Sequence, residues 1–439
     1  MIPSTASAVG TEVRYSTHPD DARQADACDP LGSLRDAFEL PRSPADPNRT
    51  AIYLCGNSLG PMPRDARRLV GDELDAWARL GTEGYGKSPR AWFEFTHEAR
   101  PALARLAGAS AADVMPMNSL TVNIHLMLAS FYRPTRDRNI VIIEDTAFPS
   151  DSYAVQSHVA RMGCDPRATV VRLRPRSGER CLRTEDVEDE LHRRGDSVAL
   201  LFLGSLNYLT GQVMDVERLT AAAHARGAKV GWDLAHAIGN VLTPLAKSNA
   251  DFAVWCSYKY LNGGPGAVGG AYVNPRWSGE RGVPRLAGWW GNNPATRMQM
   301  HPDFDPAPGI DGFALSNVPV LTTAPLFASL ALFERAGFEA LRARSRELTG
   351  YLEFLIDSLA LPGVSIVTPR DPLRRGCQLS IAVSGDGRAT LASLRASDVI
   401  GDFREPDIIR LAPAPLFTSR HEVWRAAAAL GAHYGVRLK

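Results

Sequence analysis

The stretch DFAVWCSYKYLNGGPG, residues 251–266, places a single lysine, Lys259, between an apolar run and a glycine-rich turn. The chain carries 49 lysines and arginines, and only five of them are lysines. Arginine therefore supplies nearly all of the basic charge elsewhere, and the lysine here needs a specific explanation. An arginine guanidinium stays protonated in proteins, whereas a lysine amine can lose its proton and act as a nucleophile. The stretch predicts amine chemistry at the end of a buried strand.

The segments before this stretch alternate between apolar strands and amphipathic helices. The pattern predicts strands at 139–145, 168–174, 197–205 and 251–258, and one that runs into a turn at 228–239. It predicts helices at 64–80, 119–132, 152–163, 184–195 and 215–227, the second of them capped by Asn118 or Ser119. Apolar strands alternating with helices are typical of a mostly parallel sheet covered on both faces. We therefore predict the α/β fold class.

The pattern changes after residue 290, where Gly, Pro and Asn become frequent. Beyond that segment we predict helices at 323–337, 338–359 and 420–435 and strands at 364–369, 377–383 and 408–412. Two to three strands with flanking helices indicate a second, small α+β domain. We expect a flexible leader that is ordered only where it docks (1–25), a segment joining the small domain (26–56), a large domain (57–315) and the small C-terminal domain (316–439).

The composition argues against several classes of function. A formal charge of +1 gives the chain no overall electrostatic attraction for nucleic acid or an anionic membrane. No apolar stretch approaches the ~20 residues of a membrane-spanning helix. The six cysteines form no C-x-x-C pair, and no Cys/His cluster has the spacing of metal ligands. We expect free thiols in a reducing cytoplasm, no metal and a small-molecule substrate.

Polar side chains stand where the predicted parallel strands end, which is where such sheets bind ligands. Asp145 ends one strand and Asp233 another, and Lys259 follows a third. A buried lysine beside an acid suggests a Schiff-base site for pyridoxal 5'-phosphate, whose ring nitrogen needs a carboxylate partner. Asp233 would serve as that carboxylate, and the helix start at 117–123 would hold the phosphate.

Each of these residues also has a plain structural interpretation. Lys259 could be a surface lysine, and Asp233 could simply begin a turn. His236, three residues after Asp233, and Phe148 could be ordinary core residues. Their convergence at strand ends, together with the scarcity of lysine, favours the site.

Nine stretches in order resemble the kynureninase family. They are YLCGNSLGPMP, NSLTVNIHLMLASFY, DTAFPSD, NYLTGQ, WDLAHAIGN, WCSYKYLNGGPG, GWWG, SNVP and IIRLAPAPLF, and the resemblance runs from about residue 50 to the end. It implies the type I pyridoxal-phosphate fold of aspartate aminotransferase, a large domain with a mostly parallel sheet plus a small α+β domain. It also implies a homodimer whose site residues are partly shared across the interface.

The resemblance implies a role for each matching residue. Lys259 would bind the cofactor covalently, Asp233 would pair with its ring nitrogen, and Tyr258 would act as an acid. The other cofactor-binding residues would be Leu120, Thr121, Phe148, Pro149, Ser150, Asp151, Gly204, His236, Trp289 and Asn317. The substrate would be held by Arg410, a bidentate clamp for its α-carboxylate, and by Asn57 and Asn292.

Two positions depart from the family pattern. Gly204 stands where a serine or threonine usually contacts the phosphate, so Ser205 would substitute or the contact would be lost. Asn292 and Asn293 follow GWWG where a ring-reading histidine is common. The implied reaction is hydrolysis of L-kynurenine, or of 3-hydroxykynurenine or another ring-substituted relative, to an anthranilate and L-alanine.

Two alternatives stay open. One is a cysteine desulfurase or aminotransferase of the same fold. A desulfurase would need a mobile catalytic cysteine. Cys377 is the relevant thiol, and its sequence context favours a strand over a flexible loop. The other alternative is a non-catalytic scaffold that retains the fold, against which Lys259, Asp233 and Arg410 argue.

Overall fold

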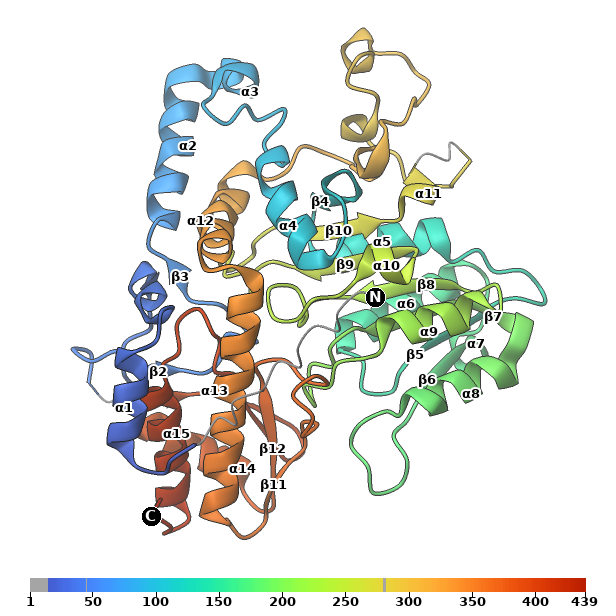
Figure 1. Cartoon of the computed structure of the whole chain (residues 1–439). Coiled ribbons are helices and arrows are strands. Elements are labelled where there is room, and N and C mark those ends of the chain that lie inside the picture. The colour runs from blue at the N-terminus through green and yellow to red at the C-terminus, as the bar shows by residue number, and fades with distance from the viewer. Residues whose placement is uncertain (1–14, 45, 279–281) are drawn as a thin grey trace, which may run out of the picture.

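The computed structural model describes residues 15–44, 46–278 and 282–439, and its largest element is a seven-stranded sheet (Figure 1). The strands lie in the order β4 (Val114–Pro116), β10 (Gly269–Val273), β9 (Phe252–Cys256), β8 (Lys229–Asp233), β7 (Val198–Gly204), β5 (Ile140–Glu144) and β6 (Val170–Leu173). Strands β5 to β9 run parallel, and β10 is antiparallel to both of its neighbours. The predicted α/β fold with a mostly parallel sheet is confirmed. The sequence did not reveal β4 and β10, since β4 has three residues and β10 begins with two glycines, which are depleted in strands.

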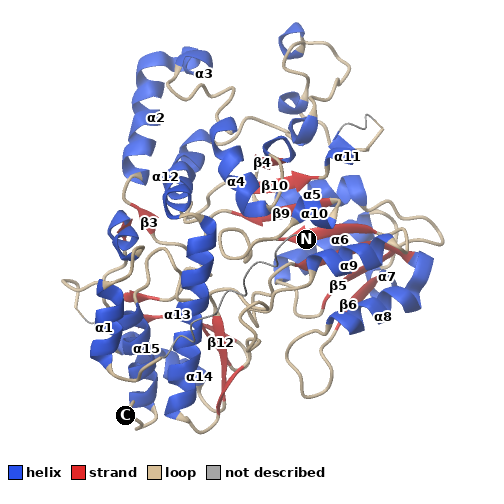
Figure 2. Ribbon diagram, in the orientation of Figure 1, coloured by secondary structure: helices blue, strands red, loops and turns tan. Residues whose placement is uncertain are grey.

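Helices cover both faces of this sheet (Figure 2). Along β5, Ile140 and Ile142 pack into the core that includes α8 (Thr184–Arg194) and α9 (Val216–His224). Val141 and Ile143 point to the opposite core, with α5 (Leu120–Phe131) and α6 (Pro149–Arg161). Successive side chains of a strand point to opposite faces, so a strand covered on both sides must be apolar throughout.

A second, antiparallel sheet has the strand order β11 (Val364–Ile366), β12 (Leu379–Val383), β15 (Ile408–Leu411) and β14 (Asp402–Arg404). Its core is shared with α13 (Phe338–Leu359), α14 (Gly387–Ala396) and α15 (Arg420–His433). The prediction of two to three strands missed β14, because a three-residue strand with charged residues at both ends carries no apolar pattern.

The N-terminal segment packs against this second unit. Helix α1 (Pro19–Ala27) contacts α15, and β2 (Ile52–Tyr53) pairs in parallel with β13 (Val399–Ile400). Of the leader expected over 1–25, residues 1–14 lie outside the described residues. Residues 19–25 are helical where α1 packs against α15. Pro19 starts the helix, acidic residues follow in its first turn, and Ala22 is buried in the core around α15.

The remaining elements connect these two units. The short strands β1 (Phe38–Glu39) and β3 (Met62–Pro63) pair with each other, and α2 (Ala66–Leu80) packs along α12 (Val320–Ala336). Shorter helices are α3 (Gly84–Lys87), α4 (Arg100–Ala107), α7 (Pro166–Thr169), α10 (Leu245–Ser248) and α11 (Pro275–Ser278). Among the described residues, no helix is both long and apolar enough to cross a membrane.

Candidate active site

A cavity of about 140 Å³ lies beyond the carboxyl ends of β5, β7, β8 and β9. Its position agrees with the rule that open parallel sheets bind ligands at this edge. The cavity wall brings together many of the residues singled out from the sequence: Leu120, Thr121, Phe148, Ser150, Asp151, Gly204, Asp233, His236, Tyr258 and Lys259.

Lys259 reaches this cavity from the turn that follows β9. The residue is 8% exposed, and its Nζ lies 5.6 Å from the ring centroid of Phe148 and 5.9 Å from that of Tyr258. Gly60 packs against the same turn, where its N–H donates to the Tyr258 carbonyl at 2.8 Å. A Cβ at position 60 would lie 2.4 Å from the Lys259 carbonyl, so only glycine fits there. The backbone therefore fixes where the amine enters the site.

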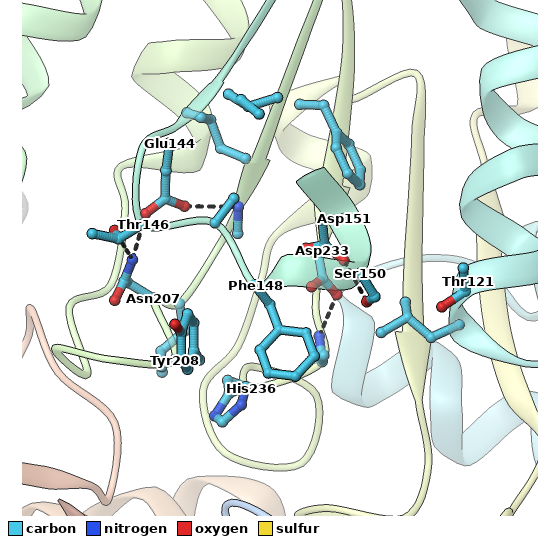
Figure 3. A pocket seen from close by; sticks show the side chains of 18 of the residues that line it. Thr121, Glu144, Thr146, Phe148, Ser150, Asp151, Asn207, Tyr208, Asp233 and His236 are labelled. Atoms are coloured by element: carbon cyan, nitrogen blue, oxygen red, sulfur yellow. Dashed lines mark hydrogen bonds between the residues drawn. The ribbon is translucent and has the colours of Figure 1, made fainter. Parts of the chain in front are cut away.

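Two carboxyl groups, those of Asp233 and Asp151, lie next to each other in the cavity wall (Figure 3). Asp233 ends β8, and its Oδ1 accepts from the Ala235 N–H at 2.8 Å. Burial raises the pKa of Asp233, while the charge of Lys259 opposes that rise. Burial, the charge of Asp233 and a hydrogen bond to it raise the pKa of Asp151 well above its ordinary value. The raised pKa of Asp151 favours its protonated form, whose O–H can donate a hydrogen bond to Asp233, and Asp233 is then the carboxylate available to a cationic ligand.

Aromatic and imidazole rings line the side of the cavity next to these acids. Phe148 meets the Tyr208 ring edge-on with a centroid distance of 5.2 Å. His236 is buried, and its Nδ1 has no hydrogen-bond partner among the described residues. Burial lowers the pKa of His236 well below its ordinary value, as do the charges of Lys259 and Arg410. The imidazole is therefore neutral and has a nitrogen free for a ligand.

The N-terminus of α5 forms the anion-binding end of the cavity. Ser119 is the N-cap, as predicted, but its side chain makes no capping hydrogen bond, which leaves the first-turn N–H groups available. Asn118 adopts a left-handed backbone with φ of 48°, and its amide donates to Asn123 at 2.9 Å. Across the turn, a Cβ at Gly269 would lie 3.0 Å from the Leu120 nitrogen, so glycine keeps this approach open. Such a helix start binds phosphate.

These observations fit pyridoxal phosphate. The α5 N-terminus matches its phosphate, Asp233 matches a protonated ring nitrogen, and Phe148 offers a face for the ring. The unpartnered nitrogen of His236 and the amine of Lys259 complete the set of groups that such a cofactor needs.

Arg410 and Asn57 lie next to each other beyond Tyr208. Arg410 is 1% exposed on β15, and its Nη1 donates to the Tyr208 carbonyl at 2.8 Å. The Asn57 amide oxygen, in the orientation that accepts, lies 3.2 Å from Arg410 Nη2. Neither residue forms the wall of the cavity itself.

The remaining predicted residues are not in this cavity. Pro149 starts α6 directly after Phe148. Trp289 is 46% exposed, and Asn292 accepts from the Asp305 N–H at 2.8 Å within its own loop. Asn317 lines a separate aromatic hollow beside α2 and α12. A single chain therefore does not assemble the whole predicted set.

The expectation that Asp145 faces the site is wrong, and the adjacent Glu144 lines the cavity instead. Glu144, not Asp145, faces the cavity, whereas Asp145 points away and lies 3.3 Å from Arg174. Glu144 accepts from the Gly204 N–H at 3.0 Å and from Asn207 at 2.5 Å, and burial raises its pKa to about 7.

Whether Ser205 substitutes at Gly204 or the phosphate contact is lost stays a prediction, and Ser205 is not in the cavity wall. The Gly204 N–H is taken by Glu144, and the Ser205 hydroxyl faces Thr243 at 3.4 Å. Asn207 and Tyr208 line the cavity although the sequence singled out neither. Both residues lie in the stretch NYLTGQ, which contributed to the family resemblance but did not mark them as residues of the site.

Known structures share this architecture at low sequence identity. The cystine C–S lyase C-DES, solved with its product cysteine persulfide, superimposes with a TM-score of 0.73 at 20% identity, covering 87% of this chain and 97% of that one. The apo cysteine desulfurase of Thermococcus onnurineus gives a TM-score of 0.72 at 16% identity, covering 97% and 99%. With the cavity described above, this likeness defines the class: the chain has the type I fold of pyridoxal-phosphate-dependent enzymes.

Sequence relatives narrow the class to one family. The model of the kynureninase C-terminal domain matches residues 341–430. The kynureninase of Myxococcus xanthus is 50% identical over 94% of this chain and 96% of its own length. That of Salinispora tropica is 49% identical with the same coverage. The chain belongs to the kynureninase family.

Proposed function

We propose that the protein binds pyridoxal phosphate and hydrolyses the Cβ–Cγ bond of L-kynurenine, or of a ring-substituted relative, to an anthranilate and L-alanine. The observation that carries the proposal is the meeting of Lys259 and Asp233 in one buried cavity at adjacent strand ends. Membership of the kynureninase family supports the choice of reaction.

The residues of the cavity suit the steps of such a reaction. When bound, the cofactor supplies an electron sink for the carbanion at the substrate α-carbon. Lys259 removes and returns the α-proton, and Asp233 keeps the ring nitrogen protonated. Burial raises the pKa of Tyr258, so its phenol keeps a proton that it can donate to Cβ when the Cβ–Cγ bond breaks. Water adds to the γ-carbonyl, which leaves as the carboxylate of the anthranilate.

The desulfurase alternative needs a reactive cysteine, and Cys377 does not suit that role. It is fully buried two residues before β12, rather than within the strand as expected, and its N–H donates to Asn240 at 2.9 Å. Burial raises the pKa of its thiol to about 12. A thiol held in the protonated state is a poor nucleophile.

The function is tested by alanine release with two substrates. We expect the purified protein with cofactor to release L-alanine and the matching anthranilate in equal amounts, from 3-hydroxykynurenine at least as fast as from kynurenine. In place of the histidine common at this position in the family, the smaller Asn292 would leave room for a ring substituent. We propose that Asn292 reads the ring, and Asn292→His is expected to lower kcat/KM for the hydroxylated substrate relative to kynurenine.

Different outcomes of this test reject the reaction and the role of Asn292. Absence of alanine release from either substrate would reject the reaction. A strong preference for unsubstituted kynurenine, with a ratio unmoved by Asn292→His, would reject the ring role of Asn292 alone.

We further propose a homodimer in which Trp289 and Asn317 of one chain complete the cavity of the other. The exposed indole of Trp289 and the aromatic hollow around Asn317 support this proposal, because both lie open on the isolated chain. Asn317 Oδ1 has no hydrogen-bond partner among the described residues, which leaves its capacity to accept unused in the isolated chain.

Complementation between two inactive variants tests the shared site. Lys259→Ala and Asn317→Ala are each expected to be inactive alone. In a mixed dimer, one cavity combines the intact Lys259 of one chain with the intact Asn317 of the other. An equimolar mixture, dissociated and reassembled, should therefore recover about a quarter of wild-type activity. Recovery of none, with mixed dimers demonstrated by mass, would mean that each site lies within one chain.

We also propose a cytoplasmic location and the division into 26–56, 57–315 and 316–439. The six free thiols support a reducing compartment, and the two sheets with separate cores support the division.

A further inference from the structure

The edge of the Arg410 guanidinium formed by Nε and Nη2 is already hydrogen-bonded to a carboxylate of the protein, that of Asp402. Asp402 lies directly opposite Arg410 on the neighbouring strand β14. Arg410 Nε donates to Asp402 Oδ1 at 2.6 Å, and Nη2 donates to Oδ2 of the same residue. Nη2 also donates to the Ser58 hydroxyl at 3.0 Å. The bidentate clamp expected for a substrate carboxylate is therefore occupied at this edge.

The donors of Arg410 can be counted. A guanidinium has five N–H groups. One on Nε and one on Nη2 go to Asp402, the second on Nη2 goes to Ser58, and one on Nη1 goes to the Tyr208 carbonyl. The single N–H left, on Nη1, lies on the side of Tyr208, a residue of the cavity wall. Arg410 in this position can offer a ligand one hydrogen bond.

A second arginine, Arg404, also pairs with Asp402. Arg404 is two residues after Asp402 on β14, and its Nη2 lies 3.2 Å from Asp402 Oδ2. Its side chain is 39% exposed. Burial raises the pKa of Tyr208 and lowers that of His236, both in the cavity wall, and the charges of Arg410 and Arg404 oppose the first shift and add to the second. The two arginines and Asp402 thus form a triad with a net charge of +1 beside the cavity.

We propose that Asp402 is a positioning residue that aims Arg410 and Arg404 together at the substrate α-carboxylate, each arginine contributing part of the grip. Asp402 holds Arg410 by Nε and Nη2, which leaves Nη1 for a ligand. The same carboxylate also pairs with Arg404. Burial raises the pKa of Asp402, but the hydrogen bond and charge of Arg410 outweigh this effect and keep the carboxylate ionised. The inference rests on the proposed function, since it assumes an α-amino acid substrate.

A competing account predicts the opposite sign. If Asp402 only competed with the substrate for Arg410, or if only the local charge mattered, its neutralisation would raise the net charge from +1 to +2. An anionic ligand would then bind more tightly. If Asp402 positions the arginines, the same change releases them, and the carboxylate binds more weakly despite the added positive charge.

The test measures recognition of a carboxylate without requiring turnover. L-Alanine and L-alaninamide are titrated into the cofactor-loaded protein, and the ratio of their Kd values reports the contribution of the carboxylate. We expect Asp402→Asn to lower the preference for alanine by about 10-fold or more, the size of a lost charge-assisted hydrogen bond. Asp402→Glu should restore part of it. An unchanged or increased preference in Asp402→Asn would overturn the proposal.

Two further variants keep the test decisive. Arg404→Gln changes a half-exposed side chain, so it is suitable even if Asp402→Asn folds poorly, and it should lower the preference several-fold. No loss in Arg404→Gln would overturn the shared grip. Asp407→Asn is the matched control, because Asp407 lies in the same hairpin but pairs with Arg180 at 2.6 Å, and it should behave as wild type. Kynurenine turnover is measured separately, so failure of the reaction and failure of the positioning role give different results.

Discussion

Lys259→Ala is expected to lower kcat by about 10²–10⁴-fold, the usual contribution of a positioned general base. The amine enters a cavity whose wall already contains Asp233, Tyr258 and Phe148, and no other lysine among the described residues lines that wall. Lys229 lies over the Trp277 ring, and Lys247 pairs with Glu217 on the surface. Neither can replace the lost amine.

Borohydride reduction followed by peptide mass spectrometry tests the covalent attachment directly. The reduced cofactor should be found on Lys259 in the wild type and on no residue in Lys259→Ala, although that variant can still bind the cofactor noncovalently. Lys247→Ala serves as the control and should keep both adduct and activity. An adduct on Lys229 or Lys247 in the wild type would contradict the assignment.

Asp233→Asn is expected to lower kcat by at least about 10- to 150-fold, which corresponds to a charge-assisted hydrogen bond of ~1.5–3 kcal/mol acting in the transition state. A neutral amide cannot hold a ring nitrogen in its protonated form. Burial and the charge of Asp233 raise the pKa of the neighbouring Asp151, which disfavours the ionised form that a replacement would need. It is therefore a poor replacement unless it ionises when Asp233 is neutralised.

Steady-state kinetics and thermal unfolding separate loss of chemistry from loss of fold. Asp233→Asn should keep a cooperative unfolding transition, since the Ala235 N–H can still donate to the amide oxygen. Asp145→Asn is the control from the neighbouring part of the sheet, where the side chain points away from the cavity toward Arg174. Turnover of Asp233→Asn at the wild-type rate would rule out the electron-sink role. Residual activity of Asp233→Asn that disappears when Asp151 is also changed would identify Asp151 as a substitute.

Much of the site was visible in the sequence because strand ends are local features. The apolar runs before Asp233 and Lys259 predict strands, and parallel strands bring their carboxyl ends to one edge. The same reasoning failed one residue away at Glu144 and Asp145. The strand before them is apolar at every position, so it has no alternation to tell which of two adjacent acids faces the cavity.

The sequence by itself determined the fold class, the main elements around the large sheet and the lysine and aspartate at its edge, since hydrophobic periodicity and strand ends depend on neighbouring residues. Only the tertiary structure decided the partners of those residues. Glu144 meets Asn207, and Arg410 meets Ser58, through contacts between segments far apart in the chain. Asp402 meets Arg410 through the register of two strands, one of them too short to leave a pattern. Such pairings depend on how elements pack in three dimensions, and a single sequence carries no local signal for them.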